Sequence, residues 1–257
     1  MELSGKIALV TGAGTGIGQG IALELAGRGA QVAVHYNSSA DGAKETLRQI
    51  EERGGKGMIV QGNVSRKEEI DAMVRKVADA WGGIDVLVNN AALQLNIDLL
   101  EYSEDDWDRV MNVNLKGYWQ CMQAVVPYMK AKGSGRIIII SSVHGKRPTD
   151  FDSVYAMTKG GIKMLGREAA AEFGKYGITV NIIEPGAIAV ARTMQPPKKT
   201  DTEEKPKPPQ RDIRWKFPLG RIGLPSDIAT LAAYIASDES EFMSGASIRL
   251  DGANMLM

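Results

Sequence analysis

Short apolar runs alternate along this chain with longer amphipathic segments, and no other feature limits its fold as strongly. The runs are rich in β-branched residues and almost unbroken in hydrophobicity, as is typical of parallel strands buried on both faces of a sheet. The runs expected to be strands are 7–10, 32–34, 58–60, 86–88, 137–140, 178–183 and 246–250. The segments between them are long enough for helices, so the alternation predicts an α/β fold: a parallel sheet of about seven strands with helices on both faces.

The expected helices include 40–53, 67–81, 154–173 and 225–237. Ser65, followed three residues later by Glu68, predicts a capping box at the start of the second of these. Because the alternation continues to the C-terminus, we expect a single domain over residues 1–257. The exception is 194–210, where five prolines stand among lysines and glutamates. Since proline interrupts helices and central strands, we expect an exposed insertion at about 190–217, placed to act as a lid.

The charge balance and the cysteine content argue against several classes of protein. Lys plus Arg equals Asp plus Glu at 31 each, so no net positive field favours nucleic acid or anionic lipid. Cys121 is the only cysteine, which excludes an internal disulfide and a multi-cysteine zinc site. No signal peptide is evident, and the longest aliphatic run, 137–140, is too short to cross a bilayer. We therefore expect a cytoplasmic protein that binds a small molecule, without a metal ion.

A glycine-rich segment directly follows the first expected strand and opens a helix. It reads Thr-Gly-Ala-Gly-Thr-Gly-Ile-Gly over residues 11–18. Glycines there permit a tight turn and let backbone N–H groups approach a pyrophosphate, and the helix N-terminus adds partial positive charge. This context predicts a dinucleotide-binding, Rossmann-type doubly wound sheet. No Lys-Ser or Lys-Thr pair follows the glycines, which argues against a P-loop nucleotidase.

Four polar residues suggest an acid/base site. Tyr155 and Lys159 are four residues apart in an expected helix, so they share one of its faces. A neighbouring ammonium favours the phenolate and brings the pKa of a phenol, about 10 in water, closer to neutrality. Ser142 follows the fifth expected strand, at the end where α/β sheets place their ligands. Asn114 is a polar amide in a largely helical stretch, where such a group often has a local role.

Together these motifs resemble the short-chain dehydrogenase/reductase family. The spacing of Gly12, Gly16 and Gly18 is similar to the family's Thr-Gly-x-x-x-Gly-x-Gly pattern. Ser142 precedes Tyr155 by thirteen positions, as the family's serine precedes its tyrosine. Further similar segments are 89–92, 113–117, 181–188 and 244–253. The resemblance therefore covers nearly the whole chain, with alanine replacing a family glycine at positions 92 and 253.

The resemblance implies a catalytic tetrad of Asn114, Ser142, Tyr155 and Lys159. Tyr155 would donate a proton to a carbonyl during reduction and remove one from an alcohol during oxidation. Lys159 would lower the pKa of Tyr155 and bind the nicotinamide ribose. Ser142 would hold the substrate oxygen, and Asn114 would hold a water molecule in a proton relay.

The resemblance also separates neighbouring candidates and implies a cofactor site. The family's Val-Asn-Leu context favours Asn114 over Asn112, and the spacing to the tyrosine favours Ser142 over Ser141. The implied cofactor-binding residues, besides the catalytic Tyr155 and Lys159, are Gly12, Thr15, Gly16, Ile17, Gly18, Tyr36, Asn37, Ser38, Asn63, Val64, Asn90, Ala91, Pro185, Gly186 and Ile188.

The end of the second expected strand bears on the choice of cofactor. Folds specific for NAD usually place Asp or Glu here to bind the ribose 2′-hydroxyl, whereas residues 35–39 of this chain contain no carboxylate. Asn37, Ser38 and Ser39 can donate hydrogen bonds to a 2′-phosphate instead. Thr15 stands where many NADP-using relatives carry a basic residue. On balance the segment favours NADP over NAD.

The substrate is less well determined. The residues expected around it are Ser142, His144, Gln94 and Tyr155. The Ser-Val-His segment that begins at Ser142 resembles bacterial glucose dehydrogenases, and other parts resemble 3-oxoacyl-carrier-protein reductases. A sugar and a 3-oxoacyl compound or other ketone are therefore both candidates. Because family members usually form tetramers, the resemblance also implies a homotetramer.

Two other functions compete with an oxidoreductase. A protein that senses a dinucleotide, or a scaffold, could keep this fold without turnover, but it would have no need of Ser142, Tyr155 and Lys159 together. A nucleic-acid-binding module is disfavoured by the zero net charge and by the lack of a basic recognition helix. The sequence therefore predicts an NAD(P)-dependent oxidoreductase that acts on a carbonyl or alcohol.

Overall fold

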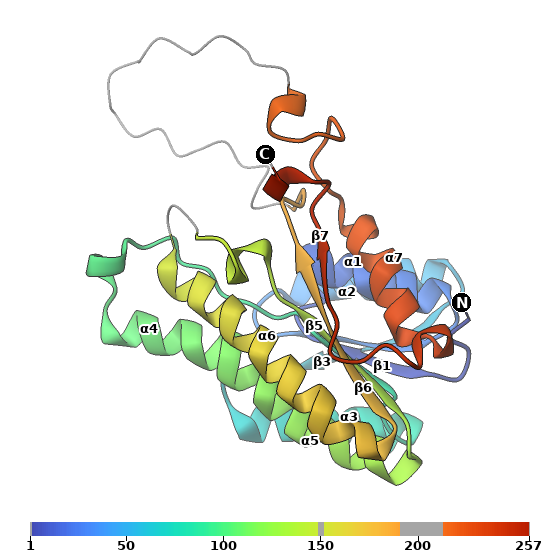
Figure 1. Ribbon diagram of the computed structural model, residues 1–257. Coiled ribbons are helices and arrows are strands. Elements are labelled where there is room, and N and C mark those ends of the chain that lie inside the picture. Colours follow the sequence, from blue (N-terminus) through green and yellow to red (C-terminus); the bar gives the residue numbers. More distant parts are fainter. Residues whose placement is uncertain (1, 149–151, 191–212, 257) are drawn as a thin grey trace.

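The computed structural model of the protein describes residues 2–148, 152–190 and 213–256. Seven strands form one parallel sheet in the order β3-β2-β1-β4-β5-β6-β7 (Figure 1). The strands are β1 (Ile7–Val10), β2 (Gln31–Tyr36), β3 (Lys56–Gln61), β4 (Val86–Asn89), β5 (Gly135–Ile140), β6 (Ile178–Pro185) and β7 (Ser247–Leu250). All seven lie where the sequence predicts strands, and the α/β parallel sheet is confirmed.

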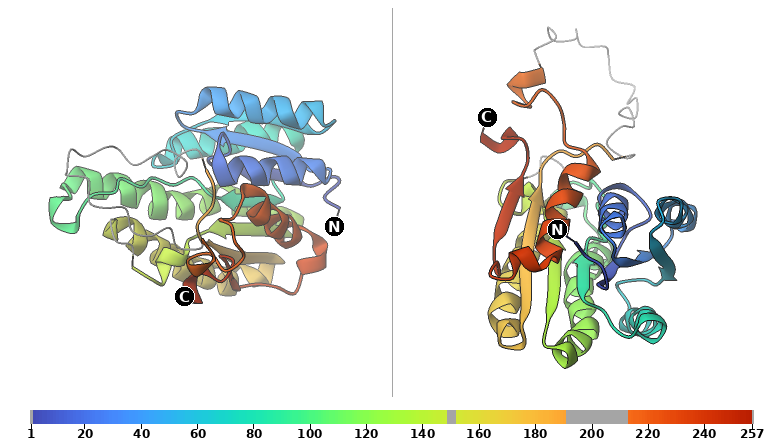
Figure 2. Two further views of the ribbon diagram at one scale, coloured as in Figure 1. Left: turned by 90° about the horizontal axis from the view of Figure 1, so that it is seen from above. Right: turned by 90° about the vertical axis from the view of Figure 1, so that its right-hand side faces the viewer.

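Helices cover both faces of the sheet (Figure 2). They are α1 (Gly16–Gly27), α2 (Ala40–Glu52), α3 (Lys67–Trp81), α4 (Glu104–Met111), α5 (Gly117–Lys132), α6 (Ser153–Phe173) and α7 (Pro225–Ala236). The core residues of α1, α2 and α7 pack on one face, and those of α3, α5 and α6 pack on the other. In β5, Ile138 and Ile140 face the first group while Ile137 and Ile139 face the second. Because successive strand side chains point to opposite faces, a strand covered on both sides is apolar throughout.

The strand order changes direction at β1, and this change positions the functional site. From β1 the chain proceeds to β2 and β3 on one side, then returns to build β4 to β7 on the other. The connections that follow β1 and β4 therefore diverge and leave a crevice at the carboxyl ends of the strands, where α/β proteins bind ligands. The glycine-rich segment follows β1, Ser141 and Ser142 follow β5, and Gly186 follows β6.

The start of α3 corrects one expectation. The capping box predicted from Ser65 and Glu68 is wrong, because the N-cap residue is Arg66 and its side chain makes no capping hydrogen bond. The hydroxyl of Ser65 instead donates to Oδ1 of Asn63 at 2.8 Å. A carboxylate from the first turn of α3, Glu69, accepts the backbone N–H of Asn63 at 2.7 Å. The polar residues at this helix start thus hold the turn after β3.

Most of the expected insertion at 190–217 lies outside the described residues, which resume at Ile213 with a short 3-10 turn, Ile213–Trp215. No helix among the described residues is both long enough and apolar enough to span a membrane.

Candidate active site

The glycine-rich segment forms a tight turn between β1 and α1. Gly12 and Gly16 adopt positive φ angles of 64° and 60°, which side chains other than glycine rarely adopt. Gly18 lies in the first turn of α1, where an added Cβ would come within 2.3 Å of the Gly12 carbonyl oxygen. The glycines thus bring the first turn of α1 onto the loop, and the helix N-terminus faces the crevice as an anion-binding site would.

Replacing Gly18 with alanine is expected to distort this loop. The Cβ would also lie 2.5 Å from Nδ2 of Asn90, which donates to the carbonyl oxygens of Thr11 and Gly12. We expect Gly18→Ala to weaken NADPH binding by at least about tenfold and to destabilise the fold by about 1–3 kcal/mol, as overpacking does. Fluorescence titration and thermal unfolding measure the two effects.

Gly27→Ala is the matched control, because Gly27 lies on the same helix and a Cβ there would meet no atom within 4 Å. It should keep NADPH affinity and stabilise the fold slightly, since alanine favours helices over glycine. Equal NADPH affinity in both variants would refute the role assigned to the close contact at Gly18.

His35, on β2, connects the glycine loop to the end of β3. Its side chain is buried, with Nδ1 accepting the N–H of Gly12 at 3.0 Å and Nε2 lying 2.8 Å from the carbonyl oxygen of Gly62. Because a backbone N–H donates and a carbonyl accepts, the ring is neutral and carries its proton on Nε2. The backbone carbonyl of His35 also accepts the N–H of Ala13 at 2.8 Å. His35 therefore holds the glycine loop after β1 and the turn after β3, which form two walls of the crevice.

Acid is expected to weaken this connection. Burial lowers the pKa of His35 below 6.5, although its bond to Gly62 opposes the shift. Below pH 6.5 the unfolded chain takes up a proton that the folded chain refuses, so the free energy of unfolding falls as the pH falls towards the folded-state pKa. The decline should approach about 1.4 kcal/mol per pH unit at its steepest.

Urea unfolding between pH 7.5 and 5 measures this decline, with the pH range chosen to bracket the ordinary pKa of 6.5. His35→Asn keeps an acceptor near Gly12 but has no ring to protonate, so its decline should be shallower by the His35 contribution. His144→Asn, which replaces the only other histidine, a half-buried one, is the matched control. Identical slopes in wild type and His35→Asn would contradict the assignment.

Tyr155 and Lys159 lie in the first two turns of α6. The helix begins at Ser153, and its N-cap residue Asp152 accepts the backbone N–H of Tyr155 at 3.0 Å. Nζ of Lys159 lies 5.5 Å from the centre of the Tyr155 ring. The i, i+4 spacing therefore places the ammonium beside the phenol on one helix face, as the sequence predicted.

Lys159 is almost completely buried, at 1% exposure. Its ammonium donates to the carbonyl oxygen of Ile140 at 2.8 Å and to the hydroxyl of Tyr118 at 3.5 Å. Within the described ranges it forms no ion pair with a carboxylate. Burial lowers the pKa of Lys159 to about 7. A lysine with this pKa can exchange protons near neutrality, which suits a group that supports an acid/base residue.

The two serines after β5 have different environments. Ser141 is buried, and its hydroxyl donates to the carbonyl oxygen of Lys159 at 2.7 Å. Ser142 is in an extended conformation, and its hydroxyl oxygen accepts the N–H of His144 at 3.2 Å. Both line the crevice. Since the proton of Ser141 is already directed to a carbonyl, Ser142 is the better placed to donate to a substrate oxygen.

Asn114 lies in a π-helical turn, Asn112–Lys116, between α4 and α5. Its Oδ1 accepts the N–H of Leu93 at 2.7 Å, and its Nδ2 donates to the carbonyl oxygen of Leu93 at 2.8 Å and to the hydroxyl of Thr158 at 3.2 Å. The side chain thus joins the loop after β4 to α6. With both amide hydrogens engaged, only the second lone pair of Oδ1 could accept a hydrogen bond from a water molecule.

Asp152 is a site residue that the sequence analysis missed. Besides capping Tyr155, its carboxylate accepts the hydroxyl of Tyr102 at 2.6 Å and the N–H groups of Leu95 and Asn96 at 3.0 and 3.1 Å. The available signal was an aspartate three residues before the tyrosine, a typical N-cap position. No sequence pattern indicated that Leu95, Asn96 and Tyr102, from the loop after β4, would contact this carboxylate.

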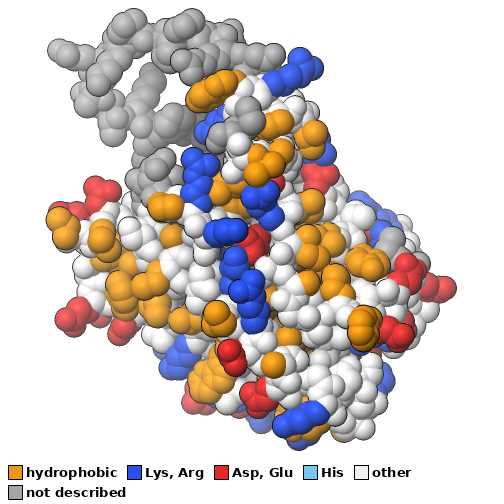
Figure 3. Space-filling model, viewed as in Figure 1, with side chains coloured by type: hydrophobic (Ala, Val, Ile, Leu, Met, Phe, Trp, Pro, Cys, Tyr) orange, Lys and Arg blue, Asp and Glu red, His pale blue; other side chains and the backbone are white. Residues whose placement is uncertain are grey.

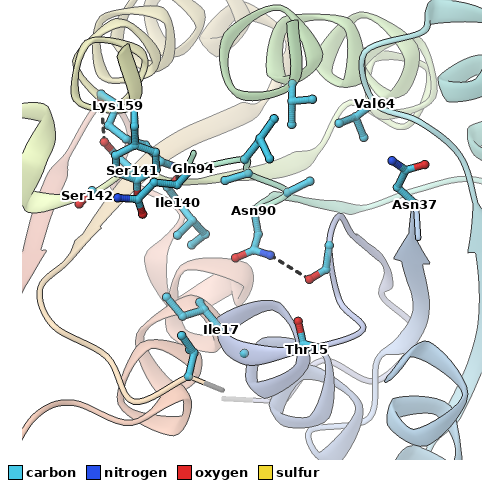
Figure 4. A pocket seen from close by; sticks show the side chains of 18 of the residues that line it. Thr15, Ile17, Asn37, Val64, Asn90, Gln94, Ile140, Ser141, Ser142 and Lys159 are labelled. Atoms are coloured by element: carbon cyan, nitrogen blue, oxygen red, sulfur yellow. Dashed lines mark hydrogen bonds between the residues drawn. The ribbon is translucent and has the colours of Figure 1, made fainter. Parts of the chain in front are cut away.

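A cavity of about 1100 Å³ joins these parts (Figure 4). In the close view, Asn37 and Val64 lie at one end, Thr15 and Ile17 lie near the middle, and Ser142 and Lys159 lie at the other end. The predicted site residues that line it are Gly12, Thr15, Gly16, Ile17, Asn37, Ser38, Asn63, Val64, Asn90, Ala91, Gln94, Ser142, His144, Tyr155, Lys159, Pro185, Gly186 and Ile188.

Three predicted residues do not line this cavity. Gly18 lies behind the loop against Gly12, and Asn114 is fully buried behind Leu93. Tyr36 packs partly buried against the core on the side of α1 and α2. It lies at the end of β2, and the cavity wall there is formed by the residues that follow it. Gly18, Asn114 and Tyr36 can therefore contribute to ligand binding only indirectly, through the residues next to them.

A dinucleotide fits the lining. The cavity runs from polar residues after β2 and β3, past the loop at the N-terminus of α1, to Tyr155 and Lys159. Among the described lining residues none is Asp or Glu, so no carboxylate opposes a pyrophosphate. An added Cβ at Gly12 would approach Cα of Ala91 to 2.9 Å, so the loop follows its neighbour closely and leaves the crevice open.

Comparisons with known proteins show the family of this chain. The profile of a family described as Enoyl-(Acyl carrier protein) reductase matches residues 12–253. A short-chain type dehydrogenase/reductase from Mycobacterium marinum is 31% identical, with a TM-score of 0.87 over 100% of this chain and 97% of that one. The chain belongs to the short-chain dehydrogenase/reductase family. It is therefore an NAD(P)-dependent oxidoreductase of the short-chain type.

Similar members of the family have varied names. The 3-oxoacyl-[acyl-carrier-protein] reductase of Staphylococcus epidermidis is 37% identical over 96% of this chain and 98% of that protein. The 3beta-hydroxysteroid dehydrogenase 1 of Eggerthella lenta is 36% identical over 99% of this chain and 95% of that protein. A putative short-chain alcohol dehydrogenase from Sinorhizobium meliloti has a TM-score of 0.88 at 32% identity, covering 99% of this chain and 98% of that one.

Proposed function

We propose that this enzyme interconverts a carbonyl compound and its alcohol, with Tyr155 as general acid and base and NADP as its cofactor. One observation carries the proposal: the glycine loop opens into the same cavity as Ser142, Tyr155 and Lys159. The cofactor, when bound, supplies or accepts the hydride. The proton and the substrate oxygen are handled by side chains at the inner end of the cavity.

Each of these side chains has a distinct task. The Tyr155 hydroxyl protonates the carbonyl oxygen in reduction and takes the alcohol proton in oxidation. The Lys159 ammonium, close to the ring, favours the phenolate. The Ser142 hydroxyl donates to the substrate oxygen and keeps it within reach of Tyr155. Asn114 holds the loop after β4 against α6. Its Oδ1 accepts a hydrogen bond from a water molecule of the proton relay.

The preference for NADP is supported by the far end of the cavity. Asn37, Ser38 and Ser39 line it and are exposed, so they can donate hydrogen bonds to a 2′-phosphate. The described segments 35–39 and 62–65, which follow β2 and β3, contain neither a carboxylate nor a Lys or Arg. Without a cation the preference rests on neutral hydrogen bonds, so we expect NADPH to bind tighter than NADH by about tenfold.

Fluorescence titration with NADPH and NADH, followed by cofactor oxidation with a panel of ketones, aldehydes and 3-oxoacyl thioesters, tests the proposal. Sugars and secondary alcohols with the oxidised cofactors test the reverse direction. Tighter NADPH binding and turnover of a carbonyl would support the proposal, and tighter NADH binding would overturn the cofactor preference. Cofactor binding without turnover of any compound would favour the sensor or scaffold instead.

We also propose self-association, as a homotetramer. Exposed apolar side chains on α4, α5 and α6 support it: Trp107, Trp119, Met157 and Met164. Figure 3 shows hydrophobic side chains over this part of the molecule. Single exposed apolar residues are ordinary, but several on neighbouring helices are typical of an interface.

A further inference from the structure

A second cavity, of about 530 Å³, adjoins the first one. The two share His144, Gly186 and Ala187, and the second includes no residue of the glycine loop. The second cavity therefore extends from the end of the first cavity that holds Ser142 and Tyr155, away from the glycine loop. Its remaining lining residues are Val143, Arg147, Pro148, Trp215, Lys216, Phe217, Asn254 and Met255. A group attached to the reacting carbonyl carbon would enter this space.

The charges around the two cavities all have one sign. The charged residues that line them are Arg109, Lys159, Arg147 and Lys216. No Asp or Glu lines either cavity in the part of the chain that the structure describes. The whole chain has as many acidic as basic residues, 31 of each, so this one-sided lining is local. A cleft lined by one sign of charge concentrates ligands of the opposite sign.

Binding of the phosphates of a dinucleotide would explain the basic residues of the first cavity. It would not explain those of the second. Arg147 and Lys216 line the second, and within the described ranges neither forms an ion pair with a carboxylate. Nη1 of Arg147 lies 3.8 Å from the sulfur of Met255, and Nζ of Lys216 lies 5.7 Å from the centre of the Phe217 ring. Figure 3 shows Lys and Arg side chains along the middle of this face of the molecule.

The other walls of the second cavity are apolar. Trp215, Phe217 and Met255 form them, and the side-chain amide of Asn254 donates to the carbonyl oxygen of Lys216. This bond connects the C-terminal turn to the segment that carries Trp215 and Phe217. The cavity thus offers an apolar surface with cations at its edge, which matches a ligand that has an apolar body and an anionic group.

We propose that the physiological substrate carries an anionic group, a carboxylate or a phosphate, linked to its reacting carbonyl by an apolar segment. The carbonyl lies at Ser142 and Tyr155, the apolar segment contacts Trp215, Phe217 or Met255, and Arg147 and Lys216 bind the anion. This inference rests on the proposed function, since it places the substrate relative to Tyr155. It adds no chemical step and assigns a substrate class to the enzyme.

Matched substrate pairs test this inference. Methyl-ketone acids of increasing chain length, beginning with levulinate, are compared with their methyl esters, and the phosphate monoester of 5-hydroxypentan-2-one is compared with 5-hydroxypentan-2-one itself. Each pair has the same reacting carbonyl, so the ratio of kcat/KM reports the anion alone. We expect a ratio of at least about ten in favour of the charged member of one series, from charge-assisted hydrogen bonds. The better series then identifies the anion as carboxylate or phosphate.

The double variant Arg147→Gln, Lys216→Gln should lower that ratio by at least about tenfold, mainly through KM. Lys146→Gln is the control, because Lys146 is an exposed lysine beside Arg147 that lines neither cavity. Calorimetric titration of the NADP⁺-loaded enzyme with levulinate and its ester gives a second readout that needs no turnover. Thermal unfolding confirms that each variant is folded.

The possible outcomes separate the two proposals. Equal kcat/KM for every charged and neutral pair, with real turnover of ketones, would overturn the anionic substrate and leave the proposed function intact. A double variant that loses acid and ester alike would also overturn it, since the two cations would then act on the fold. Turnover of no compound would refute the proposed function, and the calorimetric comparison would still decide whether the second cavity selects anions.

Discussion

Tyr155→Phe is expected to abolish turnover while leaving cofactor binding nearly unchanged. The substitution removes one hydroxyl and keeps the ring that lies 5.5 Å from Nζ of Lys159. Since a positioned acid/base contributes about 10²–10⁴ in rate, kcat should fall by at least that factor. NADPH affinity should stay within about twofold, because the glycine loop and the residues after β2 are untouched. Steady-state rates and fluorescence titration on the same preparation measure both.

Tyr128→Phe is the matched control for the loss of a phenol. Tyr128 lies on α5, packs against the core on the side of α3 and α6, and lines neither cavity. It should keep wild-type kcat. A Tyr155→Phe enzyme with comparable kcat would refute the acid/base assignment, and one that had lost NADPH binding would show that the hydroxyl serves the cofactor rather than the proton.

Lys159→Met is expected to inactivate the enzyme and at the same time to stabilise its fold. The lysine is buried beside a carbonyl oxygen and a phenol, with no carboxylate paired to it among the described residues. Placing an uncompensated charge in such a site is unfavourable, whereas methionine fills a similar volume without charge. Activity and NADPH affinity should both fall, because Lys159 supports Tyr155 in the proposed mechanism and the family resemblance implies that it binds the nicotinamide ribose.

The stabilisation should depend on pH with a definite sign. Burial lowers the pKa of Lys159 from 10.5 to about 7. Between these values the unfolded chain holds a proton that the folded chain has released, so the free energy of unfolding of the wild type rises with pH across this window. The advantage of Lys159→Met should therefore be greatest at pH 7 or below and shrink towards pH 10.5. Urea unfolding at pH 7 and pH 9 measures the change.

Lys163→Met is the control for this experiment. Lys163 lies one turn further along α6, and its ammonium is 2.7 Å from the carboxylate of Glu184, with both side chains largely buried. Removing it leaves a buried carboxylate unpaired, so we expect a loss of about 3–5 kcal/mol in stability instead of a gain. If Lys159→Met destabilised the fold as strongly, the view of Lys159 as an uncompensated charge would be wrong.

The sequence predicted the elements of this protein well because each has a local cause. A strand covered on both faces must be apolar at every position, which is why the four isoleucines of β5 were recognised. Gly12 and Gly16 were identified because a turn with positive φ needs them. The Tyr155–Lys159 spacing fixes their shared helix face without any tertiary information.

The residues that the sequence analysis missed depend on contacts between distant segments. His35 bonds to Gly12 and Gly62, which are 23 and 27 positions away, and nothing near it in the chain indicates either partner. The capping box predicted at the start of α3 is wrong because tertiary contacts override a local pattern. Its residues have the right types and spacing, but the turn after β3 engages Ser65 and Glu69 through Asn63. Local patterns cannot show such competition between partners.

The carboxylate of Asp152 has a consequence for changing the specificity of this enzyme. It holds Tyr102 and the N–H groups of Leu95 and Asn96, and it caps the helix turn that carries Tyr155. Exchanging the loop after β4 for that of a relative with another substrate would therefore also displace Tyr155. We therefore expect residues 93–102 to be exchangeable only together with the start of α6, and a chimaera that moves the loop alone should lose kcat as well as gain a new KM.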